Sequence, residues 1–154
     1  LLGLYFAQEE PEFHYSTYEL SHGGRNIVIL PGVSEHRMSA THVFEEEIML
    51  YGLRPHMHYR GKHMRFSVIY PDGTRDEIIN VPDYNFSWQP TYRLTEPMLF
   101  PAGSRVVIEG AFDNSQYNLG NPDPGATVRG GAQSWNEMFI GYFSYHKTKK
   151  RAGL

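Results

Sequence analysis

The sequence predicts an all-β protein, specifically an antiparallel β-sandwich of the jelly-roll or Greek-key kind. Apolar and polar residues alternate over many short segments, which is the periodicity of strands with one buried face. Glycine and proline turns separate these segments, and none of them shows the pattern of an amphipathic helix. The 154 residues fit one domain, which at this size buries about two thirds of the surface of its unfolded chain.

The expected strands are short and are mostly bounded by turn residues. In chain order they span residues 25–30, 37–44, 47–58, 63–70, 75–81, 92–100, 104–112 and 137–145. The turn Pro71-Asp72-Gly73 predicts a β-hairpin between two of them, because glycine tolerates the positive φ that such turns require.

Two further expectations concern the second half of the chain. Segments 92–100 and 104–112 are expected to pair with each other around the turn Pro101-Ala102-Gly103. Residues 113–134 are rich in Asn, Gly, Pro and Asp, and we expect them to form a long loop. Structureless loops of this length are uncommon inside a compact domain and are often functional.

The composition narrows the possible functions. Because the chain has no cysteine, disulfide frameworks, thiolate zinc sites and thiol catalysis are excluded. Any metal ion must therefore be held by the eight His, the six Met or carboxylates. The net charge of −3 argues against a nucleic-acid partner, and the 14% aromatic content argues against disorder. No apolar stretch approaches the roughly 20 residues of a transmembrane span.

We expect three parts along the chain. Residues 1–24 form an N-terminal extension or docking segment, 25–146 form the sandwich, and 147–154 form a basic tail. The sequence begins without a methionine, so we interpret it as an excised or processed piece of a longer protein.

The most informative motif is His56-Met57-His58, at the end of an expected strand. Residues i and i+2 of a strand point to the same face, with Cβ atoms about 6.5–7 Å apart. Two imidazoles at this spacing can converge on one metal ion. The motif alone is a weak signal, and a chance pair of surface or core histidines is the alternative.

A second segment, 137–145, supplies a donor of another kind. Alternation along this strand places Met138, Ile140 and Tyr142 on one face. Taken alone, Met138 is equally explained as a core residue, because methionine commonly fills gaps in packed interiors.

Together these pieces resemble the C-terminal domain of copper type II ascorbate-dependent monooxygenases, in a bacterial-type form. This is the family of peptidylglycine α-hydroxylating monooxygenase and dopamine β-monooxygenase. The resemblance covers residues 25–146, and its combination of motifs is specific although each fragment is not. The matching elements are His56-Met57-His58, Gly61-Lys62, Glu137-Met138 and Tyr142-Phe143, with Tyr70-Pro71-Asp72-Gly73, Tyr84-Asn85-Phe86-Ser87-Trp88-Gln89, Phe112-Asp113-Asn114-Ser115 and Asn121-Pro122-Asp123-Pro124 around them.

The resemblance implies one copper ion per chain, held by His56, His58 and Met138. It also implies that oxygen is activated at this copper for C–H hydroxylation, with ascorbate or another electron donor. The ligand set is chemically sensible, because imidazole suits copper and a soft thioether favours Cu(I). The family's C-terminal disulfides are absent, which separates this chain from the animal enzymes.

Three further residues acquire expected roles from the same resemblance. Arg54 and Tyr142 match positions that bind the substrate carboxylate in peptide-hydroxylating members, so we expect them to position a small-molecule or peptide substrate. Ile140 replaces a polar Asn of those members and puts a peptide carboxylate in question. The alternative places Arg54 in a structural salt bridge and Tyr142 in the core. His36 is a candidate for a position behind the copper ligands, or is structural.

The family normally carries a second copper site on another domain, with an adjacent His pair. This chain has no such pair, and only a chance convergence of His14, His22, His36 and His42 would supply that site here. We therefore expect a second copper domain or partner subunit and an extracytoplasmic (periplasmic or secreted) location. The alternative is a non-catalytic extracytoplasmic subunit that keeps copper for structure or electron transfer. A third interpretation is a carbohydrate- or protein-binding sandwich in which the His pair is incidental.

Overall fold

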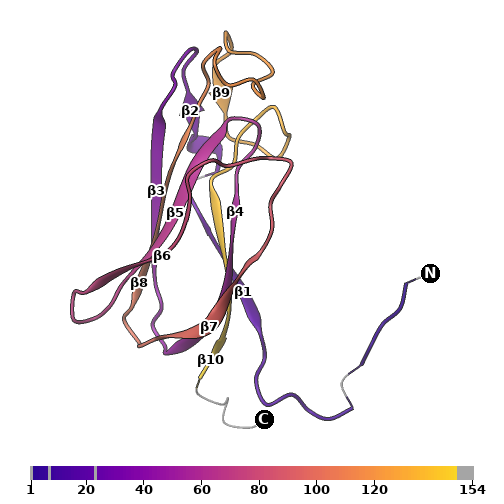
Figure 1. The fold of residues 1–154 in the computed structure, drawn as a ribbon, viewed down its shortest axis with the longest axis vertical. Helices are drawn as coiled ribbons and strands as arrows, with labels where there is room; N and C mark the ends of the chain where they lie inside the picture. Colours follow the sequence, from indigo (N-terminus) through magenta and orange to yellow (C-terminus); the bar gives the residue numbers. More distant parts are fainter. Residues whose placement is uncertain (1, 7, 23, 149–154) are drawn as a thin grey trace.

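The computed structural model describes residues 2–6, 8–22 and 24–148, and it confirms the all-β class. Two four-stranded sheets pack against each other, and a small two-stranded sheet lies at one end (Figure 1). The strand order is compatible with a jelly roll or Greek key. Within the described ranges the helical structure is one 3-10 turn, η1 (Gly24–Asn26), and no helix is long and apolar enough to cross a membrane.

Sheet 1 carries both segments of the expected site, whereas sheet 2 covers its inner face. The order in sheet 1 is β1 (Ser16–Ser21), β10 (Ile140–Lys147), β4 (Ile48–His56) and β7 (Tyr92–Phe100). The order in sheet 2 is β3 (His36–Val43), β8 (Arg105–Phe112), β5 (Gly61–Ile69) and β6 (Arg75–Val81). The small sheet pairs β2 (Val28–Ile29) with β9 (Val128–Arg129). Every strand pair within these sheets is antiparallel.

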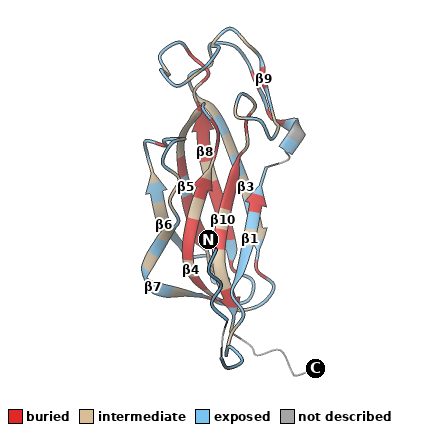
Figure 2. Cartoon of the chain, turned by 90° about the vertical axis from the view of Figure 1, so that its right-hand side faces the viewer, coloured by how far each residue is buried: buried red, intermediate tan, exposed pale blue. Residues whose placement is uncertain are grey.

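The core lies between the two sheets. The Phe143 ring of β10 meets the Phe66 ring of β5 at 5.6 Å between centroids. Figure 2 shows the buried residues concentrated in β4, β5, β8 and β10, the inner strands of both sheets. Each fully buried apolar side chain of this kind stabilises the fold by about 1.5–3 kcal/mol relative to exposure. Sheet 1 is therefore a rigid support for side chains on its outer face.

The predicted hairpin is confirmed. β5 and β6 pair from Met64 opposite Val81 to Ile69 opposite Arg75. Gly73 has a φ of 88°, and the Asp72 carboxylate accepts a 2.9 Å hydrogen bond from the Thr74 N–H. The turn therefore uses the left-handed glycine that its sequence predicts, and an Asx turn at Asp72 supports it.

The predicted pairing of 92–100 with 104–112 is wrong. Both strands exist, but β7 pairs with β4 in sheet 1 and β8 lies in the middle of sheet 2. The turn at Gly103 therefore carries the chain from one sheet to the other. Period-two alternation identifies a strand but not its partner. Pro97 is compatible with the edge position of β7, because proline cannot donate a ladder hydrogen bond.

The N-terminal region contains a strand that the sequence did not predict. β1 pairs with β10 over six residues, from Ser16 opposite Tyr145 to Ser21 opposite Ile140. The expected strand 25–30 is divided in the structure into η1 and the two-residue strand β2.

The loop 113–134 is ordered around one buried side chain. The Asn114 amide nitrogen donates to the carbonyl oxygens of Leu30 and Ala126, at 3.0 and 2.9 Å. Its oxygen accepts from the Arg60 guanidinium at 2.8 Å. The segment also contains β9, so the expectation of a loop without structure is corrected at residues 128 and 129.

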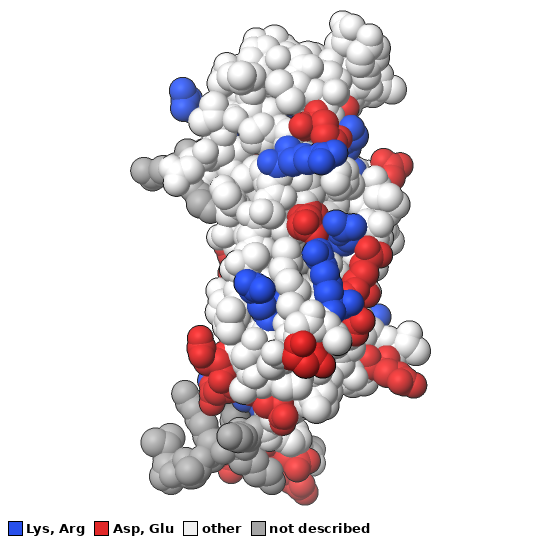
Figure 3. Space-filling model, turned by 90° about the vertical axis from the view of Figure 1, so that its left-hand side faces the viewer, with Lys and Arg blue, Asp and Glu red and all other residues white. Residues whose placement is uncertain are grey.

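Charged side chains of both signs are intermixed on the outer face of sheet 2 (Figure 3). Glu109 of β8 forms ion pairs with Arg65 of the neighbouring β5 at 3.0 Å and with Arg75 of β6, one strand further along, at 2.6 Å. Glu35 pairs with Lys62 at 2.5 Å. The outer face of sheet 2 therefore carries paired charges of opposite sign rather than a patch of one sign.

Candidate metal centre

The two imidazoles of the His-x-His motif lie side by side at the end of β4. Their ring centroids are 5.2 Å apart and the rings are nearly perpendicular, at 84°. His56 is the last residue of β4 and stands opposite Ile140 of β10. His58 is buried, with 5% of its surface exposed, whereas His56 is half-buried. This arrangement lets both rings reach one ion from the outer side of the sheet.

Hydrogen bonds fix the same tautomer in both rings. His56 Nδ1–H donates to Gln89 Oε1 at 2.6 Å, and His58 Nδ1–H donates to the Asn136 carbonyl at 3.1 Å. The Asn136 carbonyl can only accept, and the Gln89 amide is oriented because its nitrogen donates to the Phe86 carbonyl at 2.7 Å. The Nε2 lone pair of each imidazole is therefore the one available to a metal ion.

The protonation state of His58 suits the same role. Burial lowers the pKa of His58 because the charged imidazolium is poorly solvated there, and the nearby His56 lowers it further. The backbone carbonyls of Asn136 and Gln133 act in the opposite direction. A neutral imidazole is the form that binds metal ions.

Residue 57, between the two histidines, is fixed by Tyr84. Its N–H donates to the Tyr84 hydroxyl at 3.0 Å, and that hydroxyl donates to the Met57 carbonyl at 2.7 Å. Tyr84 is 7% exposed, and burial raises its pKa to about 12. One buried phenol therefore satisfies both backbone groups of Met57 just beyond the end of β4.

Met138 lies in the segment that leads into β10, between residues that adjoin the two histidines. On one side of it, the Glu137 carboxylate and the Asn136 carbonyl bond to His58. On the other side, Ile140 stands opposite His56. Phe139 is buried in the core, so alternation places Met138, which is half-buried, on the outer face that carries the histidines.

Glu137 is the buried group that joins the two segments. Its carboxylate accepts the backbone N–H of His58 at 2.8 Å and that of Arg60 at 2.7 Å. The side chain is fully buried, and this burial raises its pKa to about 7 in spite of those hydrogen bonds and the nearby Arg60 charge. Through these two bonds, Glu137 holds the backbone that follows β4 close to its own segment, in which Met138 is the next residue.

Arg60 extends this support to the loops. Its side chain is buried, with 2% exposed, and it donates to the side chain of Asn114 at 2.8 Å and to the Trp135 carbonyl at 3.0 Å. The loop 113–134 is thereby tied to the segment that carries Asn136. The sequence interpretation missed Gln89, Glu137 and Arg60 as supporting residues. Gln89 and Glu137 stand within the family motifs, which is the one signal that could have identified them.

Arg54 and Tyr142 form a stacked pair next to the histidines. Tyr142 stands directly opposite Arg54, whose guanidinium carbon lies 4.3 Å from the centre of its ring. The Tyr142 ring is 6.5 Å from the His56 ring. Both side chains are half-buried, and Arg54 makes no ion pair with any described residue. The structure therefore brings these two residues to the histidine end of sheet 1.

His36 lies apart from this cluster. It begins β3 in sheet 2, and its ring contact is with Phe112 at 6.4 Å. Among the described residues, no contact joins it to His56, His58 or Met138.

The donor set determines which metal the centre suits. The described residues contain no group of three or more His, Asp or Glu side chains that could hold one ion. A three-ligand centre at His56 and His58 therefore needs a donor of another chemistry, and the thioether of Met138 is the donor that the adjacent segment offers. Two imidazoles and a thioether suit copper, in particular Cu(I).

These features define a class: an antiparallel β-sandwich with a candidate mononuclear soft-metal centre on one outer face. Residues 22–152 match the family described as copper type II ascorbate-dependent monooxygenase, C-terminal domain. The chain belongs to this family, and the resemblance predicted from its sequence is confirmed. A search of curated proteins found no match.

Proposed function

We propose that this chain is the oxygen-activating copper domain of a monooxygenase, with His56, His58 and Met138 as ligands of one copper ion. The observation that carries the proposal is the pair of imidazoles whose Nδ1 atoms are both hydrogen-bonded, next to the segment of Met138. Copper bound there would supply activation of dioxygen for hydroxylation of a substrate C–H bond.

The surrounding residues would act by orientation. Gln89 and Asn136 engage the Nδ1 atoms of the imidazoles and leave each Nε2 as the nitrogen free for a metal ion. Glu137 holds the two ligand-bearing segments together. Because strands and buried hydrogen bonds fix these groups, the cost of ordering the ligands is met largely by folding rather than by metal binding.

Arg54 and Tyr142 would position the substrate. Stacking uses the face of the guanidinium and leaves N–H donors at its edge, and such donors match a carboxylate or another planar anion. The lack of an ion pair for Arg54 within the described ranges supports this role over a purely structural one.

The electrons would come from another domain or a partner subunit, with ascorbate or a similar donor. The family is a domain of larger monooxygenases, which supports this division of labour. Membership of this family is also the basis on which we propose an extracytoplasmic location.

Copper titration tests the proposal. The full chain, reduced and supplied with Cu(I), is expected to bind copper with His56, His58 and Met138 as ligands. His56→Ala is expected to lower copper affinity at this site at least tenfold, and Met138→Leu is expected to reduce the sulfur contribution to the X-ray absorption spectrum. His14→Ala, at an exposed position, is the matched control. Unchanged copper affinity in His56→Ala, or an unchanged sulfur signal in Met138→Leu, would contradict the assignment.

A further inference from the structure

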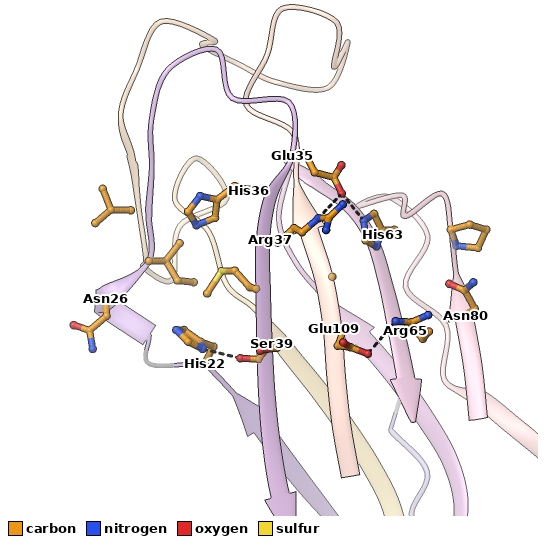
Figure 4. A pocket seen from close by; sticks show the side chains of 15 residues that line it. His22, Asn26, Glu35, His36, Arg37, Ser39, His63, Arg65, Asn80 and Glu109 are labelled. Carbon is orange, nitrogen blue, oxygen red and sulfur yellow. Dashed lines mark hydrogen bonds and ion pairs between the residues drawn. The ribbon is translucent and has the colours of Figure 1, made fainter. Parts of the chain in front are cut away.

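A second group of soft-metal donors lines a cavity beside β3. The cavity has a volume of about 870 Å³ and is lined by His22, His36 and Met38, among others (Figure 4). None of the three ligands proposed above lines it. The sequence alone gave no reason to group these residues, because His22 is separated from the other two by a turn and β2.

Two of the donors are placed by β3 itself. His36 and Met38 are two residues apart on one strand, so their Cβ atoms are about 6.5–7 Å apart on the same face. The burial pattern agrees: both are half-buried, whereas Arg37 and Ser39 between and after them are exposed. An imidazole and a thioether at this spacing can approach one ion.

The third donor is held against the same strand. His22 Nδ1–H donates to the Ser39 carbonyl at 2.8 Å, which places its ring beside the residue that follows Met38. Its backbone N–H is anchored to the Phe139 carbonyl at 3.2 Å. Figure 4 shows His22 and His36 on the same side of β3. The Nε2 lone pair of His22 is left available by this bond.

The His36 ring has no hydrogen bond to any described residue, so its two ring nitrogens are uncommitted. Burial lowers the pKa of His36, because the charged imidazolium is poorly solvated there. Glu35 also lines the cavity, but its carboxylate is engaged by Lys62 and His63. Glu109, the other carboxylate of the lining, is engaged by Arg65 and Arg75, so the free donors are two imidazoles and a thioether.

We propose that His22, His36 and Met38 form a second binding site on this chain for a soft monovalent metal ion, Cu(I), distinct from the centre at His56 and His58. Nitrogen and thioether donors without an anionic ligand select Cu(I) over harder divalent ions. The openness of the cavity to solvent gives the ion access, and the β3 backbone fixes two of the three donors in advance.

Titration with Ag(I), a redox-inert substitute for Cu(I), tests this site on the full chain. The native protein is expected to bind two equivalents in chloride-free buffer, and His36→Gln and Met38→Leu are each expected to bind one. The imidazole NMR resonances of His22 and His36 are expected to shift as one of the two equivalents of Ag(I) binds. Met38→Leu conserves volume, so its stability, checked by thermal unfolding, separates loss of a ligand from loss of the fold.

The double variant His56→Ala/His58→Ala separates the two sites. It is expected to keep one equivalent, and that equivalent is lost when His36→Gln is added. If the native chain binds one equivalent that the double variant loses, the cavity site is refuted while the first centre stands. If the native chain binds only one equivalent of Ag(I) and His36→Gln abolishes it, the cavity site is supported and the first assignment is refuted. Two native equivalents that His36→Gln and Met38→Leu leave unchanged would also refute the cavity site.

Discussion

Arg54 and Tyr142 stand opposite each other on β4 and β10, with the guanidinium carbon 4.3 Å from the centre of the ring. The pair occupies the row of the sheet next to His56, whose ring lies 6.5 Å from that of Tyr142. A cation and an aromatic face are therefore presented together beside the candidate metal centre.

The first prediction concerns this stacked pair. A double-mutant cycle of Arg54→Ala and Tyr142→Leu, measured by urea unfolding, is expected to give a coupling free energy of about 0.5–1 kcal/mol. Arg93→Ala, an exposed arginine on β7, is the control and is expected to show no coupling to Tyr142. Additive effects of Arg54→Ala and Tyr142→Leu would mean that the stacking contributes nothing in solution.

The second prediction concerns the partner of His56. Gln89→Leu removes the acceptor that holds the His56 tautomer, so copper affinity is expected to fall about 10- to 100-fold with little change in stability. The measurement is competition with a Cu(I) chelator. Gln116→Leu, at an exposed position in the long loop, is the matched control and should bind copper as the native chain does.

The third prediction concerns Glu137. Glu137→Ala leaves the buried N–H groups of His58 and Arg60 without an acceptor, and each unsatisfied group costs about 1–3 kcal/mol. The free energy of unfolding in urea is expected to fall accordingly. Glu137→Gln, which keeps one acceptor oxygen, is expected to lie between the alanine variant and the native protein. Glu96→Ala, on the exposed edge strand β7, should be nearly neutral. Equal stability of the two alanine variants would contradict the structural role of Glu137.

The fourth prediction is a pH dependence at Glu35. The hydrogen bonds from Lys62 and His63 lower the pKa of this carboxyl from its ordinary 4.5 to about 2. Because the folded-state pKa is the lower one, the stabilisation is present above pH 4.5 and is lost as the pH falls towards 2. The side chain is about one third exposed, so the contribution is that of a surface ion pair, about 0.2–1 kcal/mol.

Glu35→Gln measures this contribution. The difference in free energy of unfolding between the native chain and the variant is expected to be present at pH 6 and to shrink between pH 4.5 and pH 2. It should also decrease in high salt, because exposed pairs are screened. A difference that stays constant across this pH range would show that the carboxylate charge is not its source.

Features of the fold that depend on neighbouring residues could be predicted from the sequence, whereas long-range pairings could not. The hairpin at Gly73 was predicted because turn chemistry and alternation are both encoded in neighbouring residues. The partner of β7 was predicted wrongly, because alternation does not say which sheet a strand joins. β1 was missed because its STYELS sequence has one buried residue, Leu20, and so little apolar periodicity.

The candidate site divides in the same way. The ligand candidates follow from strand spacing, soft-donor chemistry and family motifs. The supporting contacts could not be predicted, because they join residues that are distant in sequence: Gln89 reaches His56 across 33 positions and Glu137 reaches His58 across 79. His22 and Met38 were likewise not grouped, since only the fold of β1 against β3 places them on one cavity.

The pairing of β1 with β10 has a consequence for any shortened form of the protein. The family match begins at residue 22, immediately after β1 ends at Ser21. A fragment cut at that boundary would turn β10 from an interior strand into an open edge, with unpaired N–H and C=O groups along the strand that carries Tyr142. Open edges of this kind recruit strands from other molecules. Residues 16–21 are therefore expected to protect the sheet that carries the candidate metal centre from self-association, although they lie outside the matched range.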